Sequence, residues 1–267
     1  MLTKRLIACF DVVEGRVTKA QQFQDNIDVA PAEELARRLY DDQIDEIVFY
    51  DITASAQRRK IDLETVRHVA QHVFVPFTVG GGIRSLDDMF EVLKAGAEKI
   101  SIDSMAVRNP DIIRQGAEAF GRQCIVLSTQ VKRVGVRAGL PSGYEVFIDG
   151  AREATGLDAL DWVRRGEELG AGEIVVNSID NDGTAAGYDL DITSAVADAV
   201  NVPVIASGGA GTVEHIADGF TRGGAQAAII SSILYSPRLE RNPSVAELKA
   251  GLIERGIPMR PYLTLDS

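Results

Sequence analysis

Asp11 and Lys19 are residues near the start of the chain whose types and spacing could do chemistry. Asp11 ends the apolar run at residues 6–11, and Lys19 follows eight positions later, beyond Gly15. A carboxylate at a strand end, in a partly desolvated site, can have its pKa raised toward the working range of an acid or base. We expect Asp11 to transfer protons and Lys19 to close over an anion from an active-site loop at residues 12–30. A structural carboxylate and a solvated lysine are the alternative.

Two glycine clusters follow predicted strands. Residues 79–83 read Val-Gly-Gly-Gly-Ile, and residues 207–211 read Ser-Gly-Gly-Ala-Gly. Glycine lets backbone N–H groups approach an anion, and the N-terminus of a following helix adds a favourable dipole. We therefore expect two phosphate sites and a ligand with two phosphates, unless these glycines only form tight turns. The first site would use Gly81, Gly82 and Ser104, and the second Asp182, Gly183, Gly208, Gly209, Ser231 and Ser232.

Four charged residues stand at the other ends of the predicted strands. They are Arg5, Glu46, Lys99 and Glu173, two cations and two anions. The starts of parallel strands meet at one end of a barrel, so we expect these side chains to form a ring, here called the floor ring. Mutual pairing at the face that serves stability is the ordinary interpretation of such a ring.

These residues need a scaffold, and the hydrophobic pattern predicts one. Short runs rich in Ile, Val and Phe alternate with segments of helical periodicity, the pattern of βαβ units. Eight such pairs in 267 residues predict a closed (β/α)8 barrel, in one domain over residues 1–267. An open doubly wound sheet is the alternative, but no phosphate loop follows the first strand. The predicted strands are 6–11, 46–51, 76–80, 99–103, 123–129, 173–178, 203–207 and 226–231, and the predicted helices are 31–42, 61–73, 85–96, 109–120, 156–170, 189–200, 212–222 and 243–255.

Two further patterns refine this architecture. Residues 133–155 are too long for a simple connection and are expected to form a hairpin around residues 139–143. The glycine cluster after the third strand recurs after the seventh, and the motif beginning at Asp51 is echoed at residues 180–184. Repetition at this spacing predicts an internal duplication of a half-barrel.

Composition and charge exclude several classes of protein. With 45% hydrophobic residues and a net charge of −11, the chain can form a large core and does not suit nucleic acid or an anionic membrane. No run reaches the roughly 20 apolar residues of a membrane span. Cys9 and Cys124 fall in predicted strands, so we expect two core thiols in a cytoplasmic protein. His68, His72 and His215 fall on predicted helices, so no metal or other cofactor is expected.

Seven motifs resemble the cyclase subunit of imidazole glycerol phosphate synthase, a family of histidine biosynthesis, and the likeness runs from Leu2 to about Pro261. They are ACFD at 8–11, GRVTK at 15–19, FYDITAS at 49–55, TVGGGIR at 78–84, AGEI at 171–174, SIDNDGT at 178–184 and ASGGAG at 206–211. The resemblance implies a barrel that receives ammonia from a glutamine amidotransferase (glutaminase) partner in a heterodimer. It implies that the floor ring acts as a gate through which the ammonia passes. The ammonia then reacts with a bisphosphate ribulosyl substrate, and the products are imidazole glycerol phosphate and an aminoimidazole carboxamide ribotide.

Two positions depart from the family pattern. The resemblance places a second catalytic aspartate at the end of the fifth strand, where this chain has Gln130, and an amide does not exchange protons near neutral pH. It places an asparagine at the end of the fourth strand, where this chain has Asp103, which repels a phosphate unless it is protonated or paired. The hypothesis is that Asp103 has taken over the missing carboxylate role beside Asp11. The alternatives are a paralogue that delivers ammonia to another phosphorylated acceptor, and a catalytically silent barrel that binds a phosphorylated ligand and activates a glutaminase.

Overall fold

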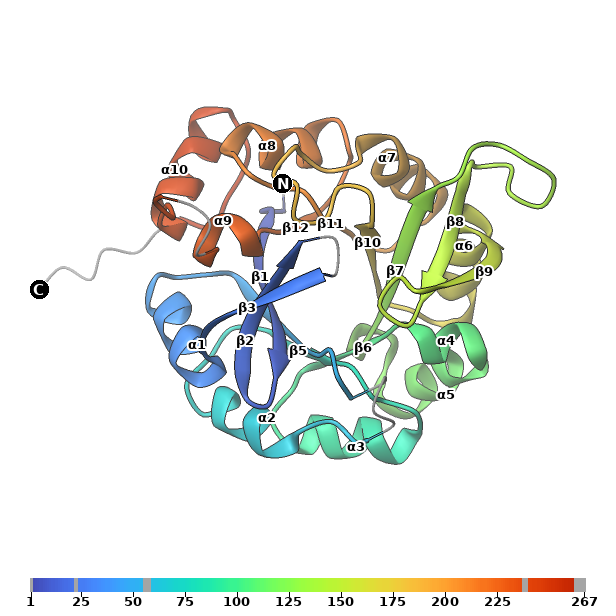
Figure 1. The fold of residues 1–267 in the computed structure, drawn as a ribbon, viewed down its shortest axis with the longest axis horizontal. Helices are drawn as coiled ribbons and strands as arrows, with labels where there is room; N and C mark the ends of the chain where they lie inside the picture. Colours follow the sequence, from blue (N-terminus) through green and yellow to red (C-terminus); the bar gives the residue numbers. More distant parts are fainter. Residues whose placement is uncertain (1, 22–23, 55–58, 237–239, 262–267) are drawn as a thin grey trace, which may run out of the picture.

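A closed ring of parallel strands forms the centre of the molecule, and helices surround it (Figure 1). The structure is a computed structural model that describes residues 2–21, 24–54, 59–236 and 240–261. Within these residues each of eight strands pairs in parallel with the next, and the last pairs with the first, which confirms the predicted (β/α)8 barrel. Around the ring the strands are β1 (Arg5–Val13), β4 (Glu46–Asp51), β5 (Phe77–Gly80), β6 (Lys99–Ile102), β7 (Ile125–Arg133), β10 (Glu173–Ser178), β11 (Val204–Ser207) and β12 (Ala227–Ile229).

The helices lie close to their predicted positions because their ends carry clear signals. Ser85 and Thr212 accept hydrogen bonds from the third residue of the helices that follow them, and Ser244 forms a capping box with Glu247. No helix in the described ranges is long and apolar enough to cross a membrane. The helices are α1 (Ala32–Asp41), α2 (Leu63–Ala70), α3 (Leu86–Lys94), α5 (Asp111–Phe120), α6 (Ala159–Leu169), α7 (Leu190–Ala199), α8 (Val213–Thr221) and α10 (Val245–Glu254), with the short α4 (Ser104–Arg108) and α9 (Ser231–Tyr235) and the 3-10 helix η1 (Arg122–Cys124).

The segment expected as a loop at residues 12–30 is instead an antiparallel ribbon. It contains β2 (Arg16–Gln21) and β3 (Gln24–Pro31), and β2 pairs with the end of β1. Glu14 and Gly15 join β1 to β2 with φ angles of 49° and 76°, the two positive values that a type I′ hairpin turn requires. The ribbon crosses the view in front of the strand ring in Figure 1, and β2 pairs with the carboxyl end of β1.

The region around the fifth barrel strand also differs from its prediction. β7 runs four residues beyond the predicted end at 129 and pairs with β8 (Tyr144–Ile148), which confirms the hairpin. β8 pairs in turn with β9 (Glu153–Asp158). The helix expected from residue 156 therefore begins only after Asp158, whose side chain accepts hydrogen bonds from the first turn of α6. Cys124 lies in η1 and is partly exposed, so the prediction of a core strand residue was wrong there, whereas Cys9 is buried in β1.

Alternate residues of the barrel strands point to opposite sides, and this decides which of them can reach a ligand. Leu6, Ala8 and Phe10 of β1 belong to the large core under the helices. Ile7 and Cys9 belong to a separate cluster inside the barrel. Asp11 continues this inward series by two positions and so comes to the open end of the barrel.

The two glycine clusters occupy equivalent places in the two halves. A Cβ on Gly81, directly after β5, would clash with the carbonyl oxygen of Asp51, the last residue of β4. A Cβ on Gly208, directly after β11, would likewise clash with that of Ser178, the last residue of β10. Their φ angles of +93° and +90° are also left-handed. Each glycine is thus required by its own backbone surroundings, in agreement with the predicted internal duplication of a half-barrel.

Candidate active site

Asp11 and Lys19 meet at the mouth of the barrel. The ribbon pairs Asp11 with Thr18, and Nζ of Lys19 lies 3.6 Å from Oδ2 of Asp11. The lysine side chain is only 10% exposed. Burial lowers the pKa of Lys19, but the negative charges of Asp11 and Asp182 raise it by more, so the ammonium form is favoured. The structure therefore places a buried cation against the predicted proton-transfer carboxylate.

Asp182, which the sequence assigns to the second phosphate site, also interacts electrostatically with this pair. Burial raises the pKa of Asp182, the ammonium of Lys19 lowers it and the charge of Asp11 raises it, with a net rise. Two carboxylates and one ammonium thus form a coupled trio, here called the mouth trio. A carboxylate repels a phosphate, whereas beside Lys19 it can exchange a proton.

Asp103 and Gln130 are in direct contact on neighbouring strands. Nε2 of Gln130 donates to Oδ2 of Asp103 at 2.5 Å. Gln130 lies within β7 and is buried, and Asp103 follows β6 and is half-buried. Burial raises the pKa of Asp103 to about 7, although the hydrogen bond from Gln130 lowers it. A carboxyl with this pKa can gain and lose a proton near neutral pH.

Backbone N–H groups are available at both glycine clusters. None of the described residues accepts a hydrogen bond from the backbone N–H of Gly82, Gly208 or Gly209. All three residues are buried. Because buried backbone donors are almost always paired, unused donors at the carboxyl ends of barrel strands fit an anionic ligand.

The serine hydroxyls of the predicted phosphate sites are already engaged. Oγ of Ser104 accepts a hydrogen bond of 2.9 Å from the backbone N–H of Asp149. Oγ of Ser231 accepts a hydrogen bond of 2.9 Å from the backbone N–H of Cys9 and donates one of 2.9 Å to the backbone carbonyl oxygen of Cys9. The hydroxyls of these two serines are therefore occupied, and their backbone N–H groups are the better candidates for binding a ligand.

The floor ring forms as predicted at the opposite end. Arg5 lies 2.7 Å from Glu46 and 2.9 Å from Glu173, measured between side-chain nitrogen and oxygen atoms. Nζ of Lys99 lies 2.9 Å from each of the same two glutamates. Cations and anions alternate, and the Glu46 side chain is only 2% exposed. In this arrangement the ring closes the floor of the barrel.

A small cavity lies between the floor ring and the mouth. Val48, Val126, Val175 and Ile205 contribute to its lining, and its volume of about 10 Å³ holds roughly one water-sized molecule. Apolar walls of this kind suit a small neutral molecule better than an ion.

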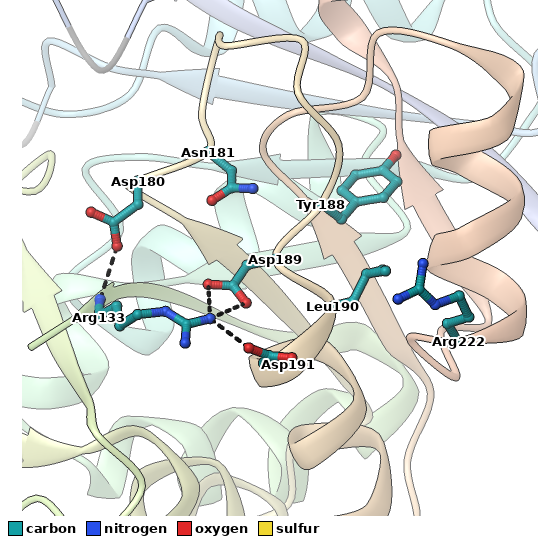
Figure 2. Close-up of a pocket in the computed structure, with 8 residues that line it drawn as sticks. All are labelled: Arg133, Asp180, Asn181, Tyr188, Asp189, Leu190, Asp191 and Arg222. Carbon is teal, nitrogen blue, oxygen red and sulfur yellow. Dashed lines mark hydrogen bonds and ion pairs between the residues drawn. The ribbon is translucent and has the colours of Figure 1, made fainter. Parts of the chain in front are cut away.

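A larger, open pocket of about 520 Å³ is lined by residues from the end of β7, the segment between β10 and α7, the start of α7 and the end of α8. Figure 2 shows Arg133 turned toward Asp189 and Asp191. Its Nη2 atom lies 3.1 Å from Oδ1 of Asp189 and 2.8 Å from Oδ2 of Asp191. The hydroxyl of Tyr144 also donates to Asp189. These charges pair with one another, and none of the predicted site residues lines this pocket.

Two residues beside the first phosphate site had no signal in the sequence. Asp149, in the turn between β8 and β9, donates its N–H to Ser104 and pairs with Arg108 at 2.6 Å. Asp149 has a positive φ of 55°, a strained value for a residue other than glycine. Only the folded hairpin brings it across 45 positions of the chain to Ser104.

The closed barrel, the mouth trio and the two glycine clusters define a (β/α)8-barrel protein whose candidate active site lies at the carboxyl ends of its strands. A family model described as "Histidine biosynthesis protein" matches residues 5–240. Imidazole glycerol phosphate synthase subunit HisF of Solidesulfovibrio magneticus is 52% identical over 260 residues, which cover 97% of this chain and 99% of the relative. The HisF subunit of Desulfatibacillum aliphaticivorans is 50% identical over 263 residues, which cover 98% of this chain and 100% of the relative. The chain therefore belongs to the histidine biosynthesis protein family and, within it, to the HisF subunits of imidazole glycerol phosphate synthase.

Proposed function

We propose that the protein is the cyclase subunit of imidazole glycerol phosphate synthase and acts in histidine biosynthesis. It uses ammonia to convert a bisphosphate ribulosyl aminoimidazole substrate into imidazole glycerol phosphate and an aminoimidazole carboxamide ribotide. The observation that carries this proposal is the mouth trio between two glycine-lined strand ends, in a chain 52% identical to a HisF subunit. Free Cys9 and Cys124 fit a reducing compartment, and we assign the enzyme to the cytoplasm.

The two glycine clusters would hold the two phosphates of the substrate. The N–H groups of Gly81 and Gly82, with that of Ser104, would bind one phosphate, and those of Gly183, Gly208, Gly209, Ser231 and Ser232 the other. Bound at both ends, the substrate spans the mouth with its reacting atoms over the barrel centre. Positioning of this kind contributes strongly to catalysis because the reacting atoms no longer search for each other.

Asp11 is the proton-transfer group of the mouth, and Lys19 acts beside it. Ammonia loses protons when its nitrogen forms bonds to carbon, and the oxygen and nitrogen groups that depart must gain them. Asp11 can accept and return these protons, while the buried ammonium of Lys19 stabilises negative charge that develops nearby. Gln130 donates hydrogen bonds in this site but carries no proton between reactants.

The route of ammonia would run from the floor to the mouth. A glutaminase partner docked on the floor, in a heterodimer, would release ammonia below the floor ring. A shift of Lys99 or Arg5 would open the ring, and the apolar cavity above it has the size of one ammonia molecule.

Turnover with external ammonia tests this function directly. The purified chain is incubated with the bisphosphate substrate and ammonium salt at alkaline pH, and the absorbance change and both products are measured. We expect turnover without a partner, and its loss in Asp11→Asn with substrate binding retained. Binding without turnover in the wild type would contradict the cyclase assignment. Glutamine in place of ammonium should support turnover only when a glutaminase subunit is added.

A further inference from the structure

The inward residues at the ends of three neighbouring strands form one polar wall of the mouth. Ser101 of β6 faces the interior, where its hydroxyl meets that of Tyr50 at 2.9 Å, and Asp103 follows it by two positions. Val126 of β7 lines the interior cavity, so Gln130, four positions on, keeps the same orientation. Asn177 of β10 lies directly beside Gln130 in the parallel register. Asp103, Gln130 and Asn177 therefore present adjacent polar groups to a ligand in the mouth.

The amide of Gln130 is used on one side only. Its Nε2 donates to Asp103, whereas its Oε1, like Oδ1 of Asn177, is buried and meets no donor among the described residues. Gln130 is itself only 8% exposed. Buried polar side-chain atoms are normally paired, so two adjacent unpaired acceptors indicate that a donor group arrives with the ligand.

We propose that Asp103 is a second proton-transfer group of this mouth, that Gln130 is the residue that positions it, and that the free amide oxygens of Gln130 and Asn177 receive an N–H or O–H of the substrate. This proposal rests on the proposed cyclase function. It assigns the reaction two carboxylates on different strands, with Asp11 on β1 and Asp103 after β6.

Gln130 can serve both protonation states of Asp103. An ionised carboxylate only accepts hydrogen bonds, and Nε2 of Gln130 supplies one. A protonated carboxyl donates, and Oε1 can accept after a half-turn of the terminal amide. The same partner therefore holds the side chain in place before and after proton transfer.

The surroundings of Asp103 favour such a cycle. Burial brings its pKa to about 7, the charge of Asp149 raises it and that of Arg108 lowers it. Asp149 and Arg108 pair with each other at 2.6 Å, so their effects on Asp103 partly cancel. The hydroxyl of Tyr50, on β4, stays protonated near neutral pH because burial raises its pKa. The proton balance is simple: one carboxylate takes a proton from the nitrogen that bonds to carbon, and the other carboxyl gives one to the departing group.

The experiment compares Asp103→Asn, Gln130→Leu and the exchange variant Asp103→Asn with Gln130→Asp, using the bisphosphate substrate and ammonium. Asp191→Asn, a highly exposed carboxylate outside the mouth, is the matched control. We expect Asp103→Asn to lower kcat about a hundredfold or more with KM little changed. The kcat of the exchange variant should be at least about tenfold higher than that of Asp103→Asn. Gln130→Leu removes a hydrogen bond that favours the ionised form, so the pH profile of kcat/KM should move to higher pH.

The outcomes separate this proposal from the cyclase assignment. Wild-type turnover establishes the cyclase function by itself, and its absence contradicts that function. Titration of the Asp103 carboxyl by NMR, in the unliganded wild type and in Gln130→Leu, needs no turnover and should show a higher pKa in the variant. A wild-type kcat in Asp103→Asn, or a Gln130→Leu profile and titration that do not move, overturns the role proposed for the pair.

Discussion

Nζ of Lys19 lies 3.6 Å from Oδ2 of Asp11, although Asp11 belongs to the barrel strand β1 and Lys19 to β2 of the ribbon. The contact depends on the tight turn at Glu14 and Gly15, which returns the chain directly above β1. In this structure the lysine is already buried against its carboxylate. The active-site segment is thus held by sheet hydrogen bonds rather than by a free loop.

Replacing Lys19 should damage the chemistry without unfolding the ribbon. Lys19→Met removes the cation that lowers the pKa of Asp182, so this pKa should rise further. We expect kcat to fall roughly a hundredfold, as is common when one charge-stabilising group is removed. Steady-state kinetics and NMR titration of Asp182 measure the two effects. Arg16→Met, on the same strand but in an exposed pair with Asp28, should retain nearly full activity.

The floor ring should be sensitive to the loss of one cation. Lys99→Met leaves the buried Glu46 and Glu173 with Arg5 alone, and breaking a buried ion pair from one side typically costs about 3–5 kcal/mol. Urea unfolding should show this loss in the free energy of unfolding. Lys94→Met at the exposed end of α3 is the control and should change it by less than about 0.5 kcal/mol. Equal free energies of unfolding for the two variants would mean that the ion pairs of Lys99 do not stabilise the fold.

Gly209 should tolerate no side chain. Gly209→Ala drives a Cβ into the carbonyl oxygen of Gly187, whereas Gly139→Ala, at a φ of +82°, meets nothing within 4 Å. The free energy of unfolding of the Gly139→Ala control should fall by roughly 1 kcal/mol, the cost of a left-handed backbone at a residue with a side chain. The free energy of unfolding of Gly209→Ala should fall by more, and its KM for the bisphosphate substrate should rise. Thermal unfolding and kinetics decide, and a Gly209→Ala protein as stable as Gly139→Ala would contradict the close packing.

The pH dependence of stability should report Asp103. Its pKa is about 7 in the folded protein and about 3.9 in an unfolded chain, so the folded state binds more protons between these values. The contribution of the protonated group to stability is full below about pH 4 and is lost as the pH rises through 7. The stability of Asp103→Asn relative to the wild type should therefore be about 2.5 kcal/mol greater at pH 8 than at pH 5. Chemical unfolding at both pH values measures this difference, and an equal gap at the two would exclude a raised pKa.

The sequence by itself determined the barrel. Alternating strand and helix patterns set the eight βα pairs, because hydrophobic periodicity is a local property of the chain. The positions of Asp11, the glycine clusters and the floor ring at strand ends were also predictable, because strand ends carry recognisable residue types. The paired charges of Arg5 and Glu46 needed only the knowledge that parallel strands start at one face.

Tertiary structure alone decided how these residues combine. The contact between Asp103 and Gln130 spans 27 positions, and β7 extends beyond its predicted end to include Gln130. The ribbon placed Lys19 against Asp11, and the β10 to α7 connection brought Asp182 to the same charges. Strand adjacency, register and hairpin geometry arise from packing between segments distant in the chain, and local residue patterns do not encode them. The partners of each carboxylate, and hence their pKa values, became definable only once the barrel closed.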